Sequence, residues 1–337
     1  MHSDRNVMVF VEQHENSIAD VSKELLSKAR ELADQLGGEV QAAALGDSGL
    51  GAELLALGSY SCSRVFYMQD SRLANYTTVP YARGLSKIIQ EYRPRFLLFG
   101  ASTLGRDLAP RVASQLRCGL TADCTDLQIG EHKAKGTLYQ DILLQIRPAF
   151  GGNIIATIIS PQSSPSMATV REGVMKKLKL QGDPQAEVID VPSNISEEDV
   201  LTQVLALEKI EKSVDLKAAK IIVSAGMGAS SPESLELVKE LAQVLGGAVA
   251  ASRPVVDGGY LGKEHQVGQT GTTVRPNLYI ACGISGQIQH RAGITEAHRI
   301  IAINKDPQAP IFECAHYAIV GDVNEVLPKM IKAYKEV

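Results

Sequence analysis

Short apolar runs of strand length alternate with longer amphipathic stretches over the first hundred residues. Their spacing predicts helices at about residues 18–36 and 81–92. The strand-like runs, rich in Val, Ile and Phe, are VMVFVE, EVQAAALG, RVFYMQ and FLLFGAS. Because strands separated by such helices pair in parallel through right-handed crossovers, the pattern predicts a doubly wound, mostly parallel sheet in an N-terminal α/β domain.

Farther along, three apolar runs follow one another without an intervening helix. They are TLYQDILLQIR, NIIATII and AEVIDVP, and their succession indicates an antiparallel extension of the first domain. Polar and charged residues then fill 192–215, with a helical pattern over about 197–208. We therefore expect an N-terminal domain over 1–191, a linker over 192–215 and a second domain over 216–337.

The α/β alternation restarts after the linker with a strand in 219–228 and a helix over about 232–245. Ser230 or Ser231 can cap this helix, since Pro232 suits a first helical turn. The glycines in AGMG match only part of a dinucleotide-binding fingerprint, and a tight strand-to-helix turn explains them without any ligand.

The stretch LYIACGISGQIQH, 278–290, is predicted to be a strand that ends at Gly283 and turns through Ser285 and Gly286 into a helix. Such a turn leaves backbone N–H groups unpaired, and these groups bind phosphate well. A strand, a small-residue turn and a helix occur in any α/β protein. The pattern by itself therefore does not identify a ligand.

Composition narrows the class of protein. A length of 337 residues predicts about two domains, and a net charge of −4 gives no reason to expect nucleic acid as a partner. We expect a cytoplasmic location without membrane insertion, because no apolar run is long enough to span a bilayer and the N-terminus lacks signal-peptide features. The five cysteines have no CxxC spacing, so we expect reduced thiols and no metal site.

Five motifs follow one another in the second half. They are SR at 252–253, VGQTG at 267–271, GISGQIQH at 283–290, NKDPQAPIF at 304–312 and GD at 321–322. This ordered block resembles the flavin-binding domain of the electron transfer flavoprotein alpha subunit family. The first half resembles the family's first domain in STLGRDLAPRVASQL, GLTADCTDL, RPAFGGNIIATI and MATVREGVM, so the resemblance covers nearly the whole chain.

The resemblance implies that the second domain is an α/β FAD-binding domain of the deoxyhypusine-synthase-like type. It places FAD against the loops that carry the motifs. The residues implied to bind FAD are Ser252, Arg253, Gln266, Val267, Gly268, Gln269, Thr270, Gly283, Ser285, Gly286, Gln287, Ile288, Gln289, His290, Asn304, Asp306, Asp322 and Val323.

Three of these residues are implied to contact the flavin ring. Arg253 supplies a fixed positive charge near the ring edge, which raises the reduction potential because the ring gains negative charge on reduction. Thr270 offers a hydroxyl to the N5 edge. His290 lies near the pyrimidine end, where a hydrogen-bond donor or a positive imidazolium stabilises the reduced ring.

Other residues are implied to hold the rest of the cofactor. Ser285 and the backbone of 286–289 bind the ribityl chain or the pyrophosphate, and Asn304 and Asp322 contact the adenosine half. Asp306 organises its loop together with the neighbouring lysine. The chain departs from the family at Met227, where an arginine usually meets the phosphates, so the resemblance implies no charged contact from this position.

The leading functional hypothesis is a redox carrier subunit without catalytic residues. It binds FAD, pairs with an electron transfer flavoprotein beta subunit and exchanges electrons with an acyl-CoA or other flavin dehydrogenase. RPAFGGNI, MATVREGVM and TGTTVRP are closer to the electron-bifurcating type of anaerobes than to the mitochondrial type. A second FAD or an AMP in the partner subunit decides between the two types. Oxidation of NADH is expected only within a complex of the bifurcating type.

Two alternatives belong to other classes. A nicotinamide-binding enzyme on the same kind of domain needs a reactive lysine, and the only lysine in the motifs near the expected ring is Lys305. A nucleotide-binding scaffold without redox work is the other alternative, based on the stress-protein-like sheet of the first domain.

Overall fold

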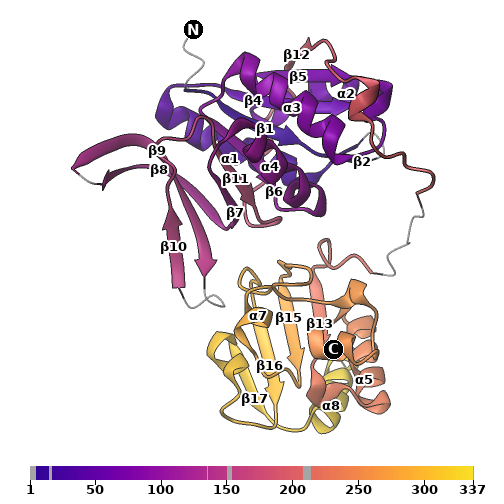
Figure 1. Cartoon of the computed structure of the whole chain (residues 1–337). Helices are drawn as coiled ribbons and strands as arrows, with labels where there is room; N and C mark the ends of the chain where they lie inside the picture. The colour runs from indigo at the N-terminus through magenta and orange to yellow at the C-terminus, as the bar shows by residue number, and fades with distance from the viewer. Residues whose placement is uncertain (1–4, 15–16, 135, 150–153, 208–213, 337) are drawn as a thin grey trace. The chain divides into compact units, whose positions relative to one another are not determined.

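A computed structural model describes residues 5–14, 17–134, 136–149, 154–207 and 214–336 of the chain. The described residues form two compact units, one within 5–207 and the other within 214–336 (Figure 1). Each unit has its own sheet and its own buried core. No helix in these ranges is long and apolar enough to cross a membrane.

The first unit is built on a seven-stranded sheet in which neighbouring strands are parallel. In spatial order the strands are β12 (Glu187–Asp190), β5 (Arg64–Gln69), β4 (Val40–Gly46), β1 (Val7–Val11), β6 (Phe96–Gly100), β11 (Ser166–Val170) and β7 (Leu120–Cys124). The α-helices of this unit are α1 (Asp20–Leu36), α2 (Gly51–Ala56), α3 (Thr78–Tyr92) and α4 (Thr103–Leu116). The predicted doubly wound sheet is confirmed.

Strand β1 shows why the sheet needs apolar residues on both faces. Val7 and Val9 belong to the core that packs against α1, whereas Met8 and Phe10 belong to the core under α3 and α4. Successive side chains of a strand point to opposite faces, so a central strand covered on both sides is apolar throughout. The unbroken run VMVFV meets this requirement.

A three-stranded antiparallel sheet extends the first unit. Its order is β10 (Ile154–Ile158), β9 (Thr137–Ala149) and β8 (Asp126–Ala134). The predicted antiparallel extension is confirmed for β9 and β10 but is wrong for AEVIDVP, because β12 lies parallel to β5. A helix-free segment after β11 carries the chain to the opposite edge of the main sheet. Residues 150–153 of the RPAFGGNI motif lie outside the described residues.

Short elements complete the first unit. Strands β2 (Gln13–His14) and β3 (Ser17–Ile18) form a two-stranded ribbon. The 3₁₀ turns are η2 (Leu57–Tyr60), η3 (Ser71–Leu73) and η5 (Glu197–Asp199).

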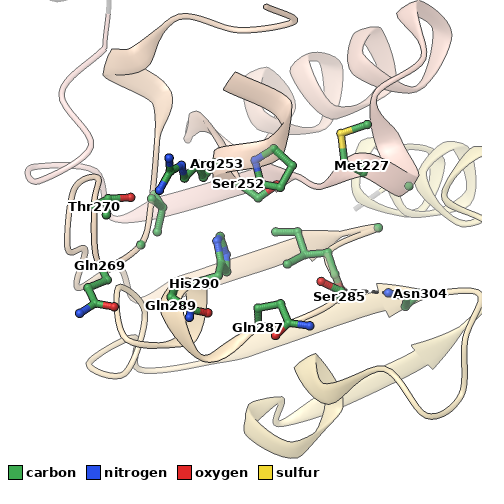
Figure 2. Close-up of a pocket in the computed structure, with 17 residues that line it drawn as sticks. Met227, Ser252, Arg253, Gln269, Thr270, Ser285, Gln287, Gln289, His290 and Asn304 are labelled. Atoms are coloured by element: carbon green, nitrogen blue, oxygen red, sulfur yellow. Dashed lines mark hydrogen bonds between the residues drawn. The ribbon is translucent and has the colours of Figure 1, made fainter. Parts of the chain in front are cut away.

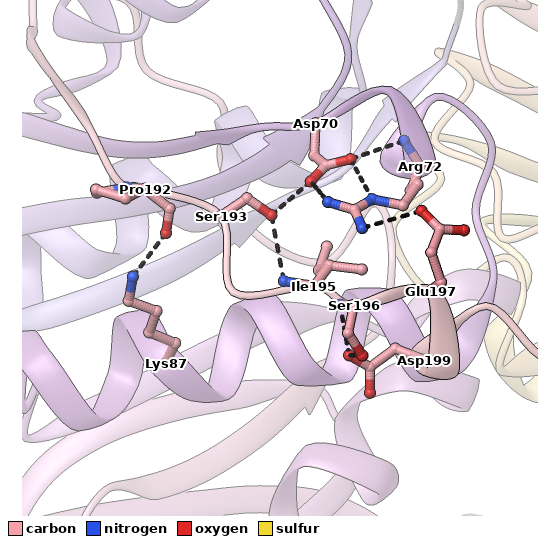
Figure 3. A network of polar contacts seen from close by, with 9 residues as sticks. All are labelled: Asp70, Arg72, Lys87, Pro192, Ser193, Ile195, Ser196, Glu197 and Asp199. Atoms are coloured by element: carbon pink, nitrogen blue, oxygen red, sulfur yellow. Dashed lines mark hydrogen bonds and ion pairs between the residues drawn. The ribbon is translucent and has the colours of Figure 1, made fainter.

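A polar network holds the start of the expected linker against the first unit (Figure 3). The Asp70 carboxylate accepts hydrogen bonds from Arg72 Nη2 at 2.6 Å and from Ser193 Oγ at 2.5 Å. Lys87 Nζ donates to the Pro192 carbonyl at 2.6 Å. The guanidinium of Arg72 holds the pKa of Asp70 well below its usual range, so this anchor stays charged at neutral pH.

The helix expected over about 197–208 is wrong within the described residues, and Glu208 lies outside them. Ser196 and Asp199 form a capping box that starts one 3₁₀ turn, but residues 200–207 have no regular secondary structure. Leu201 and Leu205 are 73% and 90% exposed. A short helix draws most of its stability from packing of its apolar face, and these leucines pack against little.

The second unit has a five-stranded parallel sheet. Its order is β14 (Ala248–Ala251), β13 (Ile221–Ala225), β15 (Leu278–Cys282), β16 (Ile300–Asn304) and β17 (Tyr317–Val320). The helices are α5 (Pro232–Val244), α6 (Arg253–Asp257), α7 (Ile288–Arg291) and α8 (Val323–Lys335), with 3₁₀ turns η6 (Met227–Ala229), η7 (Lys263–His265) and η8 (Pro310–Cys314). Ser231 caps α5, and its hydroxyl accepts from the Ser234 backbone N–H.

The two faces of this sheet are covered differently. Helices α5 and α8 cover one face through buried residues such as Val238 and Leu327. Loop residues such as Val267, Val274 and Ile294 cover the other face. The loops that carry the sequence motifs are therefore part of the core, and their backbone is held in place by packing.

Candidate functional site

A cleft of about 560 Å³ lies at the carboxyl ends of β14, β13, β15 and β16 (Figure 2). The chain leaves β13 toward β14 on one side and later adds β15 on the other side, so the cleft lies where the strand order reverses. Ligands of open α/β sheets bind at such switch points. The described residues that line it are Met227, Gly228, Ser252, Arg253, Pro254, Val267, Gly268, Gln269, Thr270, Gly283, Ile284, Ser285, Gly286, Gln287, Gln289, His290 and Asn304.

Each strand end contributes one part of the cleft. Met227 follows β13, Ser252 and Arg253 follow β14, and Asn304 ends β16. The turn after β15 contributes the longest part, because Gly283 and Gly286 have φ angles of +63° and +87° that L side chains rarely adopt. A Cβ on Gly286 would lie 2.2 Å from the Ile311 backbone N. The glycines are thus needed for the turn itself.

The turn leaves a row of backbone donors without partners. The N–H groups of Ser285, Gly286 and Gln287 have no hydrogen-bond acceptor among the described residues. Helix α7 that follows is a single turn of four residues, so its macrodipole is small. This turn would therefore bind an anion through these N–H groups and not through a helix dipole.

Thr270 points its hydroxyl into the cleft from the opposite loop (Figure 2). Gln266 is 5% exposed, and its Nε2 donates to Thr270 Oγ1 at 3.0 Å. This bond orients the hydroxyl and leaves its hydrogen available to an acceptor in the cleft. Gln266 therefore holds the Thr270 hydroxyl in place and is not itself among the described residues that line the cleft.

Arg253 is the only charged residue among the described residues that line the cleft. It is the first residue of α6, its side chain is 63% exposed, and its Nε donates to Asp257 Oδ2 at 3.1 Å. The spacing of four residues on one helix already indicates this pair, which was not expected from the motifs. Asp257 and solvent both reduce the effect of the Arg253 charge inside the cleft.

His290 lies in α7 and is 7% exposed, with its ring directed into the cleft (Figure 2). Its Nε2 is 3.0 Å from the Tyr279 hydroxyl, and its Nδ1 has no hydrogen-bond partner among the described residues. Burial lowers the pKa of His290 to about 4. Of the two predicted roles, burial favours the neutral donor at neutral pH, because it penalises the charge of an imidazolium.

Comparisons with known proteins agree with this geometry. A family model described as electron transfer flavoprotein domain matches residues 7–196, and one described as electron transfer flavoprotein FAD-binding domain matches residues 215–295. The chain is 46% identical to electron transfer flavoprotein subunit alpha of Thermoanaerobacterium thermosaccharolyticum, with 100% of this chain and 99% of the relative covered. The chain belongs to the electron transfer flavoprotein alpha subunit family.

Two further relatives support this membership. Electron transfer flavoprotein subunit alpha of Clostridium acetobutylicum is 44% identical, with 98% of this chain and 97% of the relative covered. Acryloyl-CoA reductase electron transfer subunit beta of Anaerotignum propionicum is 42% identical, with 100% and 97% covered. The chain is therefore an electron transfer flavoprotein alpha subunit homologue along its whole length, and its cofactor is FAD.

The residues of the cleft fit FAD. Amides and hydroxyls from Gln269, Thr270 and Ser285 provide neutral polar contacts, and no carboxylate lies among the described lining residues to repel a diphosphate. The buried Nδ1 of His290 needs a hydrogen-bond partner, and a flavin edge carries acceptors. The unpaired N–H groups at 285–287 suit phosphate or ribityl oxygens.

Five predicted binding residues are not among the described residues that line the cleft: Gln266, Ile288, Asp306, Asp322 and Val323. Asp322 caps α8 and pairs with Lys305 Nζ at 2.8 Å, so local partners occupy its carboxylate. Val323 is 3% exposed in the core. Gly228, Pro254 and Ile284 line the cleft but were not among the residues expected to bind FAD, although the last two lie inside or beside the SR and GISG motifs.

Asn304 and Asp306 mainly organise the loop after β16. Asn304 Nδ2 donates to the Ile284 carbonyl at 2.9 Å, and its Oδ1 accepts from the Asp306 backbone N–H at 3.0 Å. Asp306 in turn accepts from the Gln308 backbone N–H at 2.9 Å. Asn304 therefore fixes the turn that carries Ser285, in addition to lining the cleft.

Proposed function

We propose that this chain is the FAD-binding subunit of a heterodimeric electron transfer flavoprotein that exchanges electrons with an acyl-CoA dehydrogenase or a related flavin dehydrogenase. The observation that best supports this proposal is the cleft at the carboxyl ends of the second sheet, which has unpaired N–H groups and one cation, Arg253, among its described lining residues. Bound FAD supplies the one- and two-electron chemistry. The relative named as an acryloyl-CoA reductase electron transfer subunit supports an acyl-CoA partner.

The protein's own residues bind and orient the cofactor. Ser285 and the neighbouring N–H groups hold its polar chain, Thr270 donates to the flavin edge, and Arg253 supplies positive potential. His290 contributes a hydrogen bond without a charge. None of these residues breaks or forms a covalent bond, as expected for an electron carrier.

The heterodimer part of the proposal is supported by apolar side chains on the first unit. Ile154, Ile155 and Ile158 on β10 are 52%, 73% and 37% exposed. Exposed apolar side chains gathered on one sheet are typical of interaction surfaces. Without the beta subunit, the chain should therefore be poorly soluble.

The nicotinamide alternative finds less support. Its only lysine candidate, Lys305, is paired with Asp322 and is not among the described lining residues. The Asp322 carboxylate raises the pKa of Lys305, which keeps the amine protonated and non-nucleophilic. An imine-forming lysine needs the opposite environment.

Co-expression with the beta subunit tests the proposal. The purified complex should be yellow and should release one FAD per copy of this chain on denaturation, and a dehydrogenase with reduced flavin should reduce it. A second FAD in the partner favours the electron-bifurcating type, whereas AMP favours a simple carrier. Colourless protein that does not take up added FAD would contradict the proposal.

A further inference from the structure

Two buried side chains meet beneath the cleft. Tyr279 on β15 is 0% exposed, and its hydroxyl lies 3.0 Å from His290 Nε2. The hydroxyl of Ser224 on β13 is also buried and lies on the Tyr279 side of the pair. His290 is thus attached to the floor of the cleft through one ring nitrogen, while its Nδ1 bonds to no described residue.

Both members of the pair are uncharged at neutral pH. Burial lowers the pKa of His290 to about 4, and burial raises the pKa of Tyr279. A neutral imidazole carries one N–H, whereas a tyrosine hydroxyl can donate or accept. The proton of His290 therefore lies either on Nε2, with Tyr279 as acceptor, or on Nδ1, with Tyr279 as donor.

The surroundings favour one of these arrangements. The buried hydroxyl of Ser224 has no hydrogen-bond partner among the described residues, so its hydrogen is available to the neighbouring Tyr279 oxygen, which leaves the tyrosine hydrogen for Nε2. A flavin edge at the expected position presents acceptor atoms, which also need a donor.

We propose that Tyr279 is a positioning residue that keeps the single proton of neutral His290 on Nδ1, so that the ring presents a hydrogen-bond donor to the flavin. This inference rests on the proposed function. Donors then run in one direction, from Ser224 through Tyr279 and His290 toward the cofactor. The arrangement stabilises negative charge on the reduced ring without placing a cation in a buried site.

Nitrogen-15 spectra of the histidine rings test the inference in the full-length chain with its partner subunit, with and without FAD. The two nitrogens of a neutral imidazole differ strongly in chemical shift, and His290→Gln assigns the signals. The wild-type protein should carry the proton on Nδ1, and Tyr279→Phe should gain the Nε2–H form. Tyr81→Phe is the matched control, because Tyr81 is also buried and its hydroxyl donates to the Leu73 carbonyl at 2.9 Å, away from His290.

Redox titration gives the second measurement. Tyr279→Phe should lower the reduction potential of bound FAD and weaken FAD binding roughly three- to tenfold, as the loss of one oriented hydrogen bond does. A wild-type ring with its proton on Nε2, or spectra that Tyr279→Phe leaves unchanged, would overturn the inference. The wild-type spectrum shows which nitrogen of His290 carries the proton, so it tests the inference even if the variant fails to fold. Failure to bind FAD at all refutes the proposed function instead, and the flavin-free spectra still report the tautomer.

Discussion

In the first unit, Glu12 directly follows β1 and is 1% exposed, at the point where the strand order reverses between β4 and β6. Its carboxylate accepts from Ser102 Oγ at 2.6 Å, and Ser102 caps α4 through the Gly105 N–H at 2.9 Å. In the second unit, the corresponding point between β13 and β15 is an open cleft lined by glycines. The two parallel sheets thus differ at the carboxyl ends of their strands. We call the end that Glu12 occupies in the first sheet the filled edge, and the end that forms the cleft in the second sheet the open edge.

The difference lies in a few side chains and not in the architecture. A carboxylate beside the N-terminus of α4 occupies the position that an anionic ligand would take, and the helix start stabilises it. The second sheet has Gly283 and Gly286 after its central strand, and a ligand can approach their backbone. Parallel strands create a possible site at every switch point, and the residues after the strands decide whether it stays open.

The largest expected effect comes from closing the open edge. Gly286→Ala introduces a Cβ 2.2 Å from the Ile311 backbone at a φ angle of +87°. Gly259→Ala is the matched control, since Gly259 has a φ angle of +75° with open space around it. Both variants should lose about 1–2 kcal/mol from the left-handed backbone. Only Gly286→Ala should also weaken FAD binding, by roughly a hundredfold or more, because the turn must move.

Fluorescence titration of FAD and thermal unfolding check this pair of variants. Equal losses of FAD affinity in both variants would mean that the space at Gly286 is unimportant. Open space in the turn would then not explain why the second sheet binds a ligand.

Low pH should reduce the stability of the second unit through protonation of His290. The unfolded histidine takes up a proton below about 6.5, whereas the folded one does so only near 4. Between these values the unfolded state binds more protons, so the free energy of unfolding falls as the pH is lowered, by up to about 3 kcal/mol. Chemical denaturation of the FAD-free protein at pH 4.5 to 7.5 should show a smaller slope for His290→Gln than for the exposed control His298→Gln.

Removing the carboxylate at the filled edge should lower the stability of the first unit without changing FAD affinity. Glu12→Ala removes a buried hydrogen-bonded carboxylate, so we expect the first unit to lose roughly 1–3 kcal/mol. FAD affinity should be unchanged, because no described residue of the first unit lines the cleft. Denaturation monitored by circular dichroism, with FAD titration alongside, measures both quantities. A large loss of FAD affinity would show that the two edges are not independent.

Sequence patterns predicted the two sheets, and the family resemblance named most of the residues that line the cleft, because both rest on local signals. Alternating apolar runs and helical spacing are set by neighbours in the chain, and the turn at Gly283 and Gly286 carries its own glycines. The parallel pairing of β12 with β5 was missed because it depends on a strand distant in sequence. The helix expected near residue 200 was missed because its stability depends on packing partners that a periodic pattern does not contain.

Within the site, the motifs predicted which loops meet but not what each side chain does there. Asp322 was expected at the cofactor, yet its nearest partners are Lys305 and the start of α8. His290 was expected as a donor or a cation, and only its burial decides between these roles. Charge state and hydrogen-bond partners depend on the three-dimensional surroundings, which a motif does not specify.

The single cation of the open edge should tune the cofactor. A full charge about 4 Å from the ring at an effective dielectric near 20 is worth roughly 4 kcal/mol, or about 170 mV for one electron. Because Arg253 is 63% exposed and paired with Asp257, we expect Arg253→Ala to lower the one-electron potential by only some tens of millivolts. Asp257→Asn should shift it in the opposite direction. Potentiometric titration of FAD-loaded protein measures both, and an unchanged potential in Arg253→Ala would rule out this role.

The smallest expected effect concerns Met227, where the family usually carries an arginine. Met227 is 50% exposed and lines the cleft beside the turn after β15, so a cation there reaches the cofactor's phosphates through solvent. Exposed ion pairs contribute up to about 1 kcal/mol, so Met227→Arg should tighten FAD binding about threefold to fivefold. The gain should vanish at high salt, because salt screens exposed charges, and Met227→Leu should bind FAD like the parent. An equal gain for leucine would show that packing rather than charge limits binding at this end of the open edge.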